Sequence, residues 1–329
     1  MAGFKNVIGH ESVVESLQNA LMLDKVSHAY LLEGEDGSGK MTIAEAFAMA
    51  LQCEKGGKDG CFECPSCRQA LTRNHPDIIF LQQTKEKVIS VDDIRHQINE
   101  TIAIKPYGNK KKVYIIEHAE RMNDAAQNAL LKTMEEPPEY AVVLLLTTNK
   151  ELLLSTIRSR CVALQMHPIP DERIAEYLQN VLGVSEEQAS LCTAFAQGNL
   201  GKAANLSGSE DFMEIKLSTV QLMKRIHEID LYELTQAIKQ ITEYRLRITD
   251  YFDLMTIWFR DVLVYKATSD ANKLVFRDEV YDIKKQASLS SYEGIQNMIT
   301  AVYVAQTRIN SNVNLELSLE LMLLTIKEN

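Results

Sequence analysis

The sequence predicts an α/β fold, a parallel sheet with helices on both faces, followed by purely helical domains. In the amino-terminal half, short apolar runs alternate with helical segments, and continuous apolar strands of this kind indicate a sheet that is covered on both sides. A glycine-rich loop follows the first of these runs, as in P-loop proteins. Beyond Asp211 the chain contains no proline and a single glycine, Gly294, so a helical domain is expected there.

The expected elements follow in a regular order. Apolar runs predict strands at 29–32, 78–81, 113–116, 142–146 and 162–165, and helical spacing predicts helices at 41–52, 91–104 and 123–136. Ser90 or Asp92 suits the N-cap of the second helix, and Pro137 and Pro138 end the third. Three short helices are expected between 167 and 206, a polar linker at 207–211 and a helical domain over 213–329. The predicted domains are therefore 1–166, 167–207 and 208–329.

The composition is that of a globular protein without a membrane span. The chain has 329 residues, of which 46% are hydrophobic and 24% charged, and no apolar run approaches the ~20 residues that cross a bilayer. The amino terminus lacks the apolar core of a secretion signal, so a cytoplasmic location is expected. The net charge of −10 argues against strong independent binding to nucleic acid. The run Lys110, Lys111 and Lys112 is interpreted as a solvated loop before a strand.

The glycine-rich loop has most of the parts of a phosphate-binding site. Gly34, Gly37, Gly39 and Lys40 match the P-loop pattern, but Met41 stands where the pattern has Ser or Thr. The missing hydroxyl normally holds Mg²⁺ beside the phosphates, and a thioether is a poor ligand for this hard ion. Two interpretations stay open: the loop binds ATP without turnover, or its glycines serve only the strand–turn–helix geometry.

The second half of a nucleotide site is also altered. An active P-loop enzyme carries two adjacent carboxylates after a neighbouring strand, one for the metal and one for the attacking water. Glu117 stands at the metal position, but His118 stands at the water-activating position. Together with Met41, this substitution disfavours a fast intrinsic ATPase, although an active enzyme that uses Thr42 or a water-bridged metal stays as the alternative.

Four of the six cysteines predict a metal site. Cys53, Cys61, Cys64 and Cys67 have the spacing C-x7-C-x2-C-x2-C, which suits a tetrahedral Zn²⁺ ion. An iron–sulfur cluster is the chemical alternative, and free thiols are the third interpretation. Because four thiolates fill the coordination sphere, we expect a structural site and no catalytic water.

Further motifs make the chain similar to one family. They lie at 4–10, 28–34, 75–77, 128–138 and 159–161, and the four-cysteine insertion joins them. With these motifs, the chain resembles the AAA+ subunits of the bacterial DNA polymerase III clamp loader. The resemblance implies an AAA+ module, a small helical lid and a helical collar that assembles the subunits. Within the family it resembles the subunit that does not hydrolyse ATP, because the active gamma/tau subunits carry a complete P-loop and an Asp-Glu pair and this chain has neither.

The resemblance also implies roles for particular residues and partners. Arg160, in the sequence Ser-Arg-Cys, corresponds to an arginine finger that reaches the ATP of a neighbouring subunit. Asn149 matches a polar sensor after the fourth strand, and Gly201 stands where active subunits carry a nucleotide-sensing arginine. The implied partners are the gamma/tau and delta subunits, the sliding clamp and primed DNA. A zinc-stapled module that binds DNA alone is the remaining alternative, against which the net charge argues.

Overall fold

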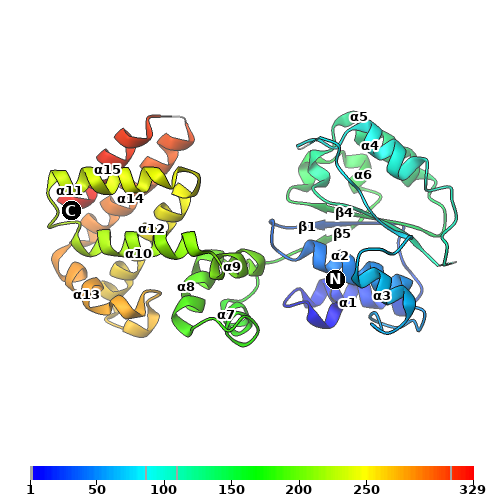
Figure 1. The fold of residues 1–329 in the computed structure, drawn as a ribbon, viewed down its shortest axis with the longest axis horizontal. Coiled ribbons are helices and arrows are strands. Elements are labelled where there is room, and N and C mark those ends of the chain that lie inside the picture. The colour runs from blue at the N-terminus through cyan, green and yellow to red at the C-terminus, as the bar shows by residue number, and fades with distance from the viewer. Residues whose placement is uncertain (1–2, 86, 109, 312) are drawn as a thin grey trace. The chain divides into compact units, whose positions relative to one another are not determined.

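The computed structural model describes residues 3–85, 87–108, 110–311 and 313–329, and it divides into two compact units. The first unit contains Met1–Arg173 and Gly198–Lys202, and the second contains Ile174–Gln197 and Ala203–Asn329 (Figure 1). Among the described residues, every helix is too short or too polar to span a membrane. The predicted division into three domains stays a prediction.

A parallel sheet of five strands forms the centre of the first unit. The strand order is β2-β3-β4-β1-β5, and each neighbouring pair is parallel. The strands are β1 (Ala29–Glu33), β2 (Ile78–Phe80), β3 (Lys112–Ile116), β4 (Ala141–Thr147) and β5 (Val162–Gln165). All five predicted strands are therefore confirmed. Every residue of β4 is buried, as expected for a strand whose two faces both contact helices.

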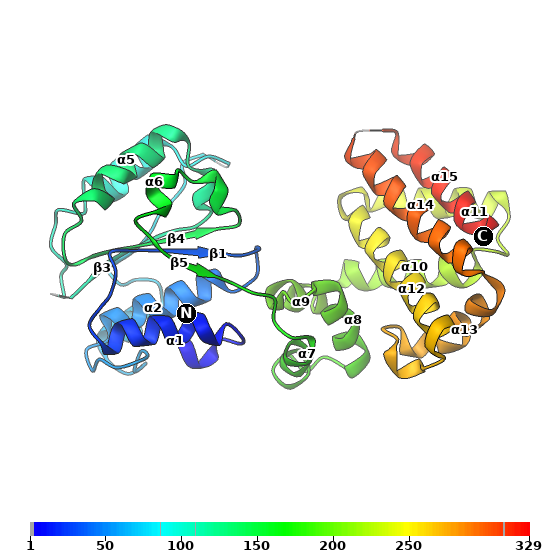
Figure 2. The same ribbon diagram turned by 180° about the vertical axis from the view of Figure 1, so that it is seen from behind.

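Helices cover both faces of this sheet. The helices α1, α2 and α3 lie on one face and α4, α5 and α6 on the other (Figures 1 and 2). Consecutive residues of β4 point to opposite faces, so Leu144 joins the core beneath the first group and Leu145 the core beneath the second. The bounds are α1 (Glu11–Met22), α2 (Lys40–Gln52), α3 (Pro65–Leu71), α4 (Val91–Ile94), α5 (Asp124–Glu135) and α6 (Ser155–Arg158).

The predicted helix 91–104 is wrong in its second half. The helix starts as predicted, because the Ser90 hydroxyl accepts the Asp93 amide and the Asp93 carboxylate accepts the Ser90 amide. Its α-helical part ends at Ile94, a π-helical turn follows at Arg95–Asn99, and the chain then leaves the helix. Beyond the turn, the carbonyls of Thr101 and Ile104 accept the Lys112 ammonium, and Pro106 restricts only the conformation of Lys105.

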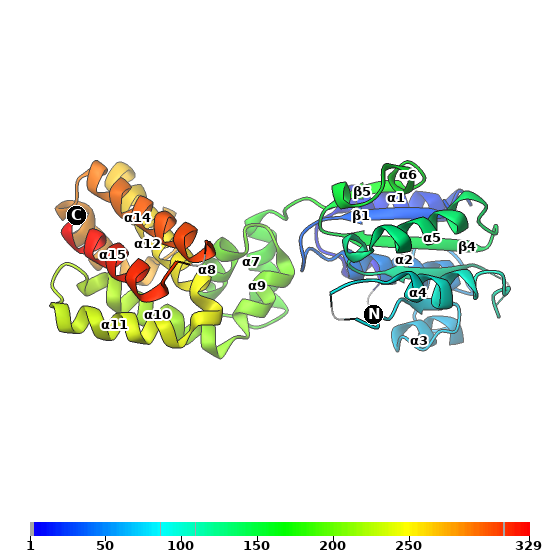
Figure 3. The ribbon, with the colours of Figure 1, turned by 90° about the horizontal axis from the view of Figure 1, so that it is seen from above.

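The second unit is helical, as predicted. Its core contains Trp258, Phe252 and Phe259, all from the long helix α12, and the helices α10, α13 and α14 pack against α12. Figure 3 shows α10, α12 and α14 side by side in this unit. The three short helices expected between 167 and 206 are α7, α8 and α9, and α9 starts in the first unit. The bounds are α7 (Asp171–Asn180), α8 (Glu186–Ala196), α9 (Leu200–Ser207), α10 (Glu210–Arg225), α11 (Leu231–Glu243), α12 (Ile248–Thr268), α13 (Val280–Leu289), α14 (Tyr292–Asn310) and α15 (Leu315–Glu328).

Candidate functional site

The glycine-rich loop joins β1 to α2 at the carboxyl edge of the sheet. Gly37 has φ +84° and Gly39 has φ +94°, a left-handed conformation that residues with a side chain rarely adopt. Gly39 is the N-cap of α2, and Gly34 begins the loop with its amide bonded to the Thr147 carbonyl. The loop therefore has the strand–turn–helix position of a phosphate-binding loop.

Lys40 contacts the loop itself. Its ammonium donates to the Gly34 carbonyl at 2.6 Å and to the Glu35 carbonyl at 2.8 Å, and it lies 3.6 Å from the Asp36 carboxylate. Burial lowers the pKa of Lys40, while the carboxylates of Asp36, Glu120 and Glu117 oppose this shift. In a loaded P-loop this ammonium contacts the β- and γ-phosphates. Here the carbonyl groups of the loop take that place.

The remaining carbonyls of the loop also have donors. The Asn199 amide donates to the Asp36 carbonyl at 2.7 Å, the Gly201 backbone N–H to the Gly37 carbonyl at 3.0 Å, and the His10 ring to the Ser38 carbonyl at 2.9 Å. Asn199 and Gly201 come from the start of α9 and its preceding turn, which belong to the first unit. A segment near the carboxyl-terminal end of the predicted lid (167–207) thus lies directly on the loop.

The contact between α9 and the loop requires glycine at position 201. A Cβ atom at Gly201 would lie 2.5 Å from the Gly37 carbonyl oxygen and 2.8 Å from the Gly37 Cα, and neither backbone atom can rotate away. The resemblance implies that active subunits carry a sensing arginine at the position of Gly201. The structure adds a steric reason why no side chain fits at this position.

We expect Gly201→Ala to destabilise the protein by about 1–3 kcal/mol, as overpacking does elsewhere. The new methyl group must push α9 away from the loop and break the bond between the Gly201 amide and the Gly37 carbonyl. Thermal unfolding of the full chain measures this loss. Gly208→Ala is the matched control, because a Cβ there meets no atom within 4 Å. Equal melting temperatures for both variants would contradict the steric argument.

The acidic residues after β3 are arranged differently from a catalytic pair. The Glu117 side chain is exposed, and His118 has a left-handed backbone with its Nδ1 3.3 Å from Glu120 and 3.9 Å from Asp36. Glu120, which was not singled out in the sequence, is the carboxylate that faces the end of β4. It accepts the Thr147 hydroxyl at 2.8 Å and the Thr148 amide at 3.2 Å. Burial alone would raise the pKa of Glu120, but these bonds and the one from its own amide lower it.

The side chains of Asn149 and Met41 both make contacts within the first unit. The Asn149 side chain accepts the Glu151 amide at 2.9 Å and so caps a short 3₁₀ helix, Lys150–Leu152. Met41 packs against the hydrophobic core on the α2 face of the sheet. The loop glycines, Lys40 and Glu117 therefore meet at one edge of the sheet, and Asn149 lies after the adjacent strand β4 at the same edge.

Arg160 lies away from this loop. It comes two residues before β5, which runs parallel to β1, so it is at the amino edge of the sheet while the loop is at the carboxyl edge. Its guanidinium donates to the Thr156 carbonyl at 3.0 Å and to the Glu135 carboxylate at 3.1 Å, and 35% of the side chain is exposed. The structure therefore does not bring Arg160 together with the other predicted nucleotide residues.

The four cysteines form one cluster beside the ends of α2 and α3. Their sulfur atoms all lie within 4.8 Å of one another, and the Cys61 and Cys67 sulfurs are 3.9 Å apart. Four sulfurs around one Zn²⁺ would be about 3.8 Å apart, given Zn–S bonds of about 2.3 Å. The amides of Cys64 and Glu63 lower the pKa of Cys61 to about 6, whereas burial raises the pKa of Cys67. The cluster can therefore bind a metal ion, and its donors are compatible with structural zinc.

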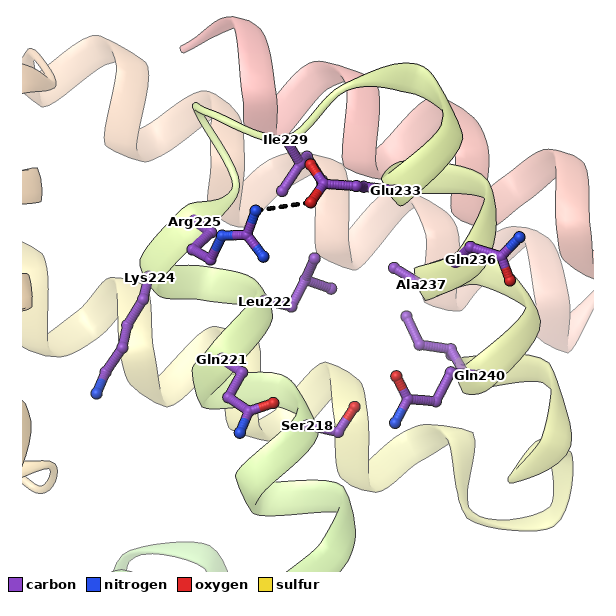
Figure 4. A pocket seen from close by; sticks show the side chains of 11 residues that line it. Ser218, Gln221, Leu222, Lys224, Arg225, Ile229, Glu233, Gln236, Ala237 and Gln240 are labelled. Atoms are coloured by element: carbon purple, nitrogen blue, oxygen red, sulfur yellow. Dashed lines mark hydrogen bonds and ion pairs between the residues drawn. The ribbon is translucent and has the colours of Figure 1, made fainter.

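The second unit carries a groove that was not predicted. It lies between α10 and α11 and has a volume of about 430 Å³ (Figure 4). Leu222 and Ala237 line it together with the amide side chains of several glutamines, and the ion pair of Arg225 with Glu233, at 2.6 Å, bridges the two helices. No sequence motif marks this groove, because it depends on the spacing of two packed helices.

Comparison with known proteins identifies relatives of both halves of the chain. The family model "DNA polymerase III, delta subunit" matches residues 9–170, and the model of the carboxyl-terminal domain of the same subunit matches residues 216–328. The chain is 30% identical to DNA polymerase III subunit delta-prime of Bacillus subtilis, over 96% of this chain and 95% of that protein. It is also 30% identical to subunit tau of the same organism, over 80% of this chain and 50% of that protein. A solved structure of a gamma subunit-related protein from Thermotoga maritima is 19% identical, with a TM-score of 0.45 over 96% of this chain and 98% of that chain.

Proposed function

Because this chain belongs to the delta-prime family of DNA polymerase III clamp-loader subunits, we propose that it does not hydrolyse ATP itself and instead completes the active site of a neighbouring subunit. The observation that carries the first half of this proposal is the closed loop. Lys40, Asn199, Gly201 and His10 satisfy the carbonyls of the loop from within the chain. A bound triphosphate would have to displace these contacts before its phosphates could reach Lys40.

Even if a nucleotide binds to the loop, the site lacks the side chains that hydrolysis requires. Met41 offers no hydroxyl for Mg²⁺ and packs, partly buried, against the core, and His118 stands where active subunits carry the carboxylate that polarises water. Glu120 is nearby, but it already accepts bonds from Thr147 and Thr148. These features support a silent site over the alternative of an active ATPase subunit.

The purified chain alone is therefore expected to release phosphate from Mg²⁺-ATP at the rate of a buffer blank. A phosphate-release assay over a range of chain concentrations measures this directly. A gamma/tau subunit with a complete P-loop and Asp-Glu pair, assayed alongside, is the positive control. Turnover that rises in proportion to the concentration of this chain, and that survives repeated purification, would overturn the silent-site proposal and favour the active-ATPase alternative.

The second half of the proposal assigns Arg160 to a neighbour. A guanidinium fork suits the γ-phosphate oxygens, on which charge develops during phosphoryl transfer. The position of Arg160 at the sheet edge opposite to its own loop supports action on another subunit. Its contact with Glu135 is a partly exposed ion pair, and such pairs are weak enough to exchange for a phosphate.

The cysteine cluster is proposed to bind a structural Zn²⁺ ion. Cys53, Cys61, Cys64 and Cys67 supply four thiolates, so no coordination position is left for water or substrate. The ion would tie the insertion between α2 and β2 into one body. Its role in this proposal is mechanical, and no catalytic step is assigned to it.

The helical second unit is proposed to hold the permanent contacts with gamma/tau and delta subunits in a cytoplasmic assembly. Several large apolar side chains on its helices are exposed, which is typical of surfaces that partners cover. In this proposal the assembled complex loads a sliding clamp onto primed DNA. The most exposed of these side chains are Leu231, Tyr232, Leu246, Tyr281, Leu289 and Tyr303.

A further inference from the structure

The sequence motif His-Pro-Asp at 75–77 has no role in the nucleotide or arginine proposals. His75 and Asp77 are nevertheless both buried, at 8% and 1% exposure. They lie between the cysteine cluster and an exposed turn at 104–108. Two separate sets of contacts lead from the cysteines toward that turn: one reaches residues 110 and 111, which follow the turn, and the other runs through His75 and Asp77 to the turn itself.

The first path runs directly from the end of α2. The Lys110 ammonium donates to the Cys53 carbonyl, and the side-chain amide of the neighbouring Gln52 donates to the Lys111 carbonyl. Gln52 is itself buried, at 2% exposure. The interpretation of the lysine run at 110–112 as solvated is therefore wrong for two of the three lysines. Lys110 contacts a cysteine residue, and Lys112 is buried in β3.

The second path runs through α3. Ser66 lies between Cys64 and Cys67, and its hydroxyl is 2.8 Å from the His75 Nε2. The other ring nitrogen of His75 accepts the Asp77 amide at 3.1 Å, so the neutral ring carries its proton on Nε2 and donates it to Ser66. His75 therefore links the cysteine-bearing helix to the start of β2.

Asp77 then holds the turn. One carboxylate oxygen accepts the Tyr107 amide at 3.0 Å and the other accepts the Gly108 amide at 3.1 Å. From inside, the Lys112 ammonium donates to the Thr101 carbonyl at 2.8 Å and to the Ile104 carbonyl at 3.2 Å. The backbone of the turn is fixed from both sides, although the side chains of Ile104 and Tyr107 are 56% and 82% exposed.

We propose that the cysteine cluster and the 104–108 turn form one mechanical unit, in which Lys110, His75 and Asp77 transmit metal binding to the turn. This inference rests on the structural zinc proposed above. A Zn²⁺ ion held by four thiolates carries a net negative charge, which the Lys110 ammonium on the Cys53 carbonyl partly compensates. Lys110 is thus a positioning residue of the metal site, and the ordered presentation of Ile104 and Tyr107 depends on the metal.

The first test compares the zinc-loaded and zinc-free full chain by hydrogen exchange. On removal of zinc with a chelator, the amides of Tyr107 and Gly108 are expected to exchange about tenfold faster or more, because their local opening becomes easier. A peptide across β4, at the centre of the sheet, is expected to keep its protection. Unchanged exchange in the turn would overturn the inference, and so would an equal loss of protection in β4, which would show general unfolding.

Two variants test the path itself. Asp77→Asn keeps the shape of the side chain but replaces one acceptor oxygen by a donor, so faster exchange in the turn is expected with zinc still bound. Lys110→Gln is expected to speed zinc release to a chelator by about tenfold, the usual effect of losing an outer partner of a metal ligand. Lys105→Gln, an exposed lysine of the same turn, is the control and should leave the release rate unchanged.

The zinc content of the purified chain separates the two levels of the proposal. A chain that binds no metal would refute the structural zinc and, with it, the coupling. A chain that binds zinc with normal affinity, but whose turn responds neither to the metal nor to Asp77→Asn, would refute the coupling alone. Equal release rates for Lys110→Gln and Lys105→Gln would remove Lys110 from the path.

Discussion

Replacing Arg160 with alanine is expected to lower ATP turnover at the adjoining site of an assembled clamp loader by about 10³-fold or more, the range known for arginine fingers supplied in trans. The guanidinium would stabilise charge on the γ-phosphate that exists only in the transition state, so the loss should appear in the rate of the chemical step. Binding of ATP to the neighbour should change much less. Among the described residues, the Arg160 side chain is hydrogen-bonded to the Glu135 carboxylate and the Thr156 carbonyl at a partly exposed position, so the fold should tolerate the change.

The measurement is single-turnover hydrolysis by a complex assembled from purified gamma/tau and delta subunits with this chain or its variant. Size-exclusion chromatography shows whether the complex still forms. Arg158→Ala is the matched control, since Arg158 lies two residues away and pairs with Glu151 of its own chain at 2.7 Å. Arg160→Lys tests the geometry, because an ammonium lacks the bidentate fork. Wild-type turnover in an intact Arg160→Ala complex would remove the finger from the proposed function.

The sheet could be predicted because its signal is local. β4 is a continuous apolar run, and its burial on both faces follows from that run alone. The helix α1 gives no such signal at its start. Its N-cap is His10 in a left-handed conformation, without the Ser, Thr, Asp or Asn that usually marks a helix start. The short helix α3 is capped by the Cys64 sulfur, which accepts the Cys67 amide, and a sequence pattern does not reveal such a cap.

Only part of the chemistry of the loop could be predicted from the sequence, and the reason is a different one. The absent hydroxyl at Met41 and the carboxylate replaced by His118 can be found by comparison with a motif. The donors that close the loop cannot be found in this way. Asn199 and Gly201 are more than 160 residues in sequence from the loop carbonyls that they contact. Glu120 was missed for the same reason, since its partner Thr147 is reached only because β3 and β4 are neighbours in the sheet. Tertiary contacts of this length are set by topology and leave no local pattern.

Loss of one metal ligand is expected to be the most destabilising single change in the first unit. Cys67 is fully buried at the start of α3, and Cys67→Ala would leave three sulfurs that no longer enclose a metal ion. Structural zinc contributes about 10–16 kcal/mol of binding free energy in small zinc domains. In this unit, a hydrophobic core of its own retains much of the fold. We therefore expect a loss of several kcal/mol, confined at first to the insertion between α2 and β2.

Three measurements on the full chain check this expectation. Elemental analysis should find one zinc per chain in the wild type, no iron, and little metal in Cys67→Ala; iron would instead indicate a cluster. Thermal unfolding should shift down by roughly 2–4 °C for each kcal/mol lost. Cys192→Ala, which removes a buried thiol in the second unit, is the control and should keep the metal. A Cys67→Ala chain that melts with the wild type would mean that the four thiols only fill space, because a closed coordination shell cannot be lost without cost to the segment it ties together.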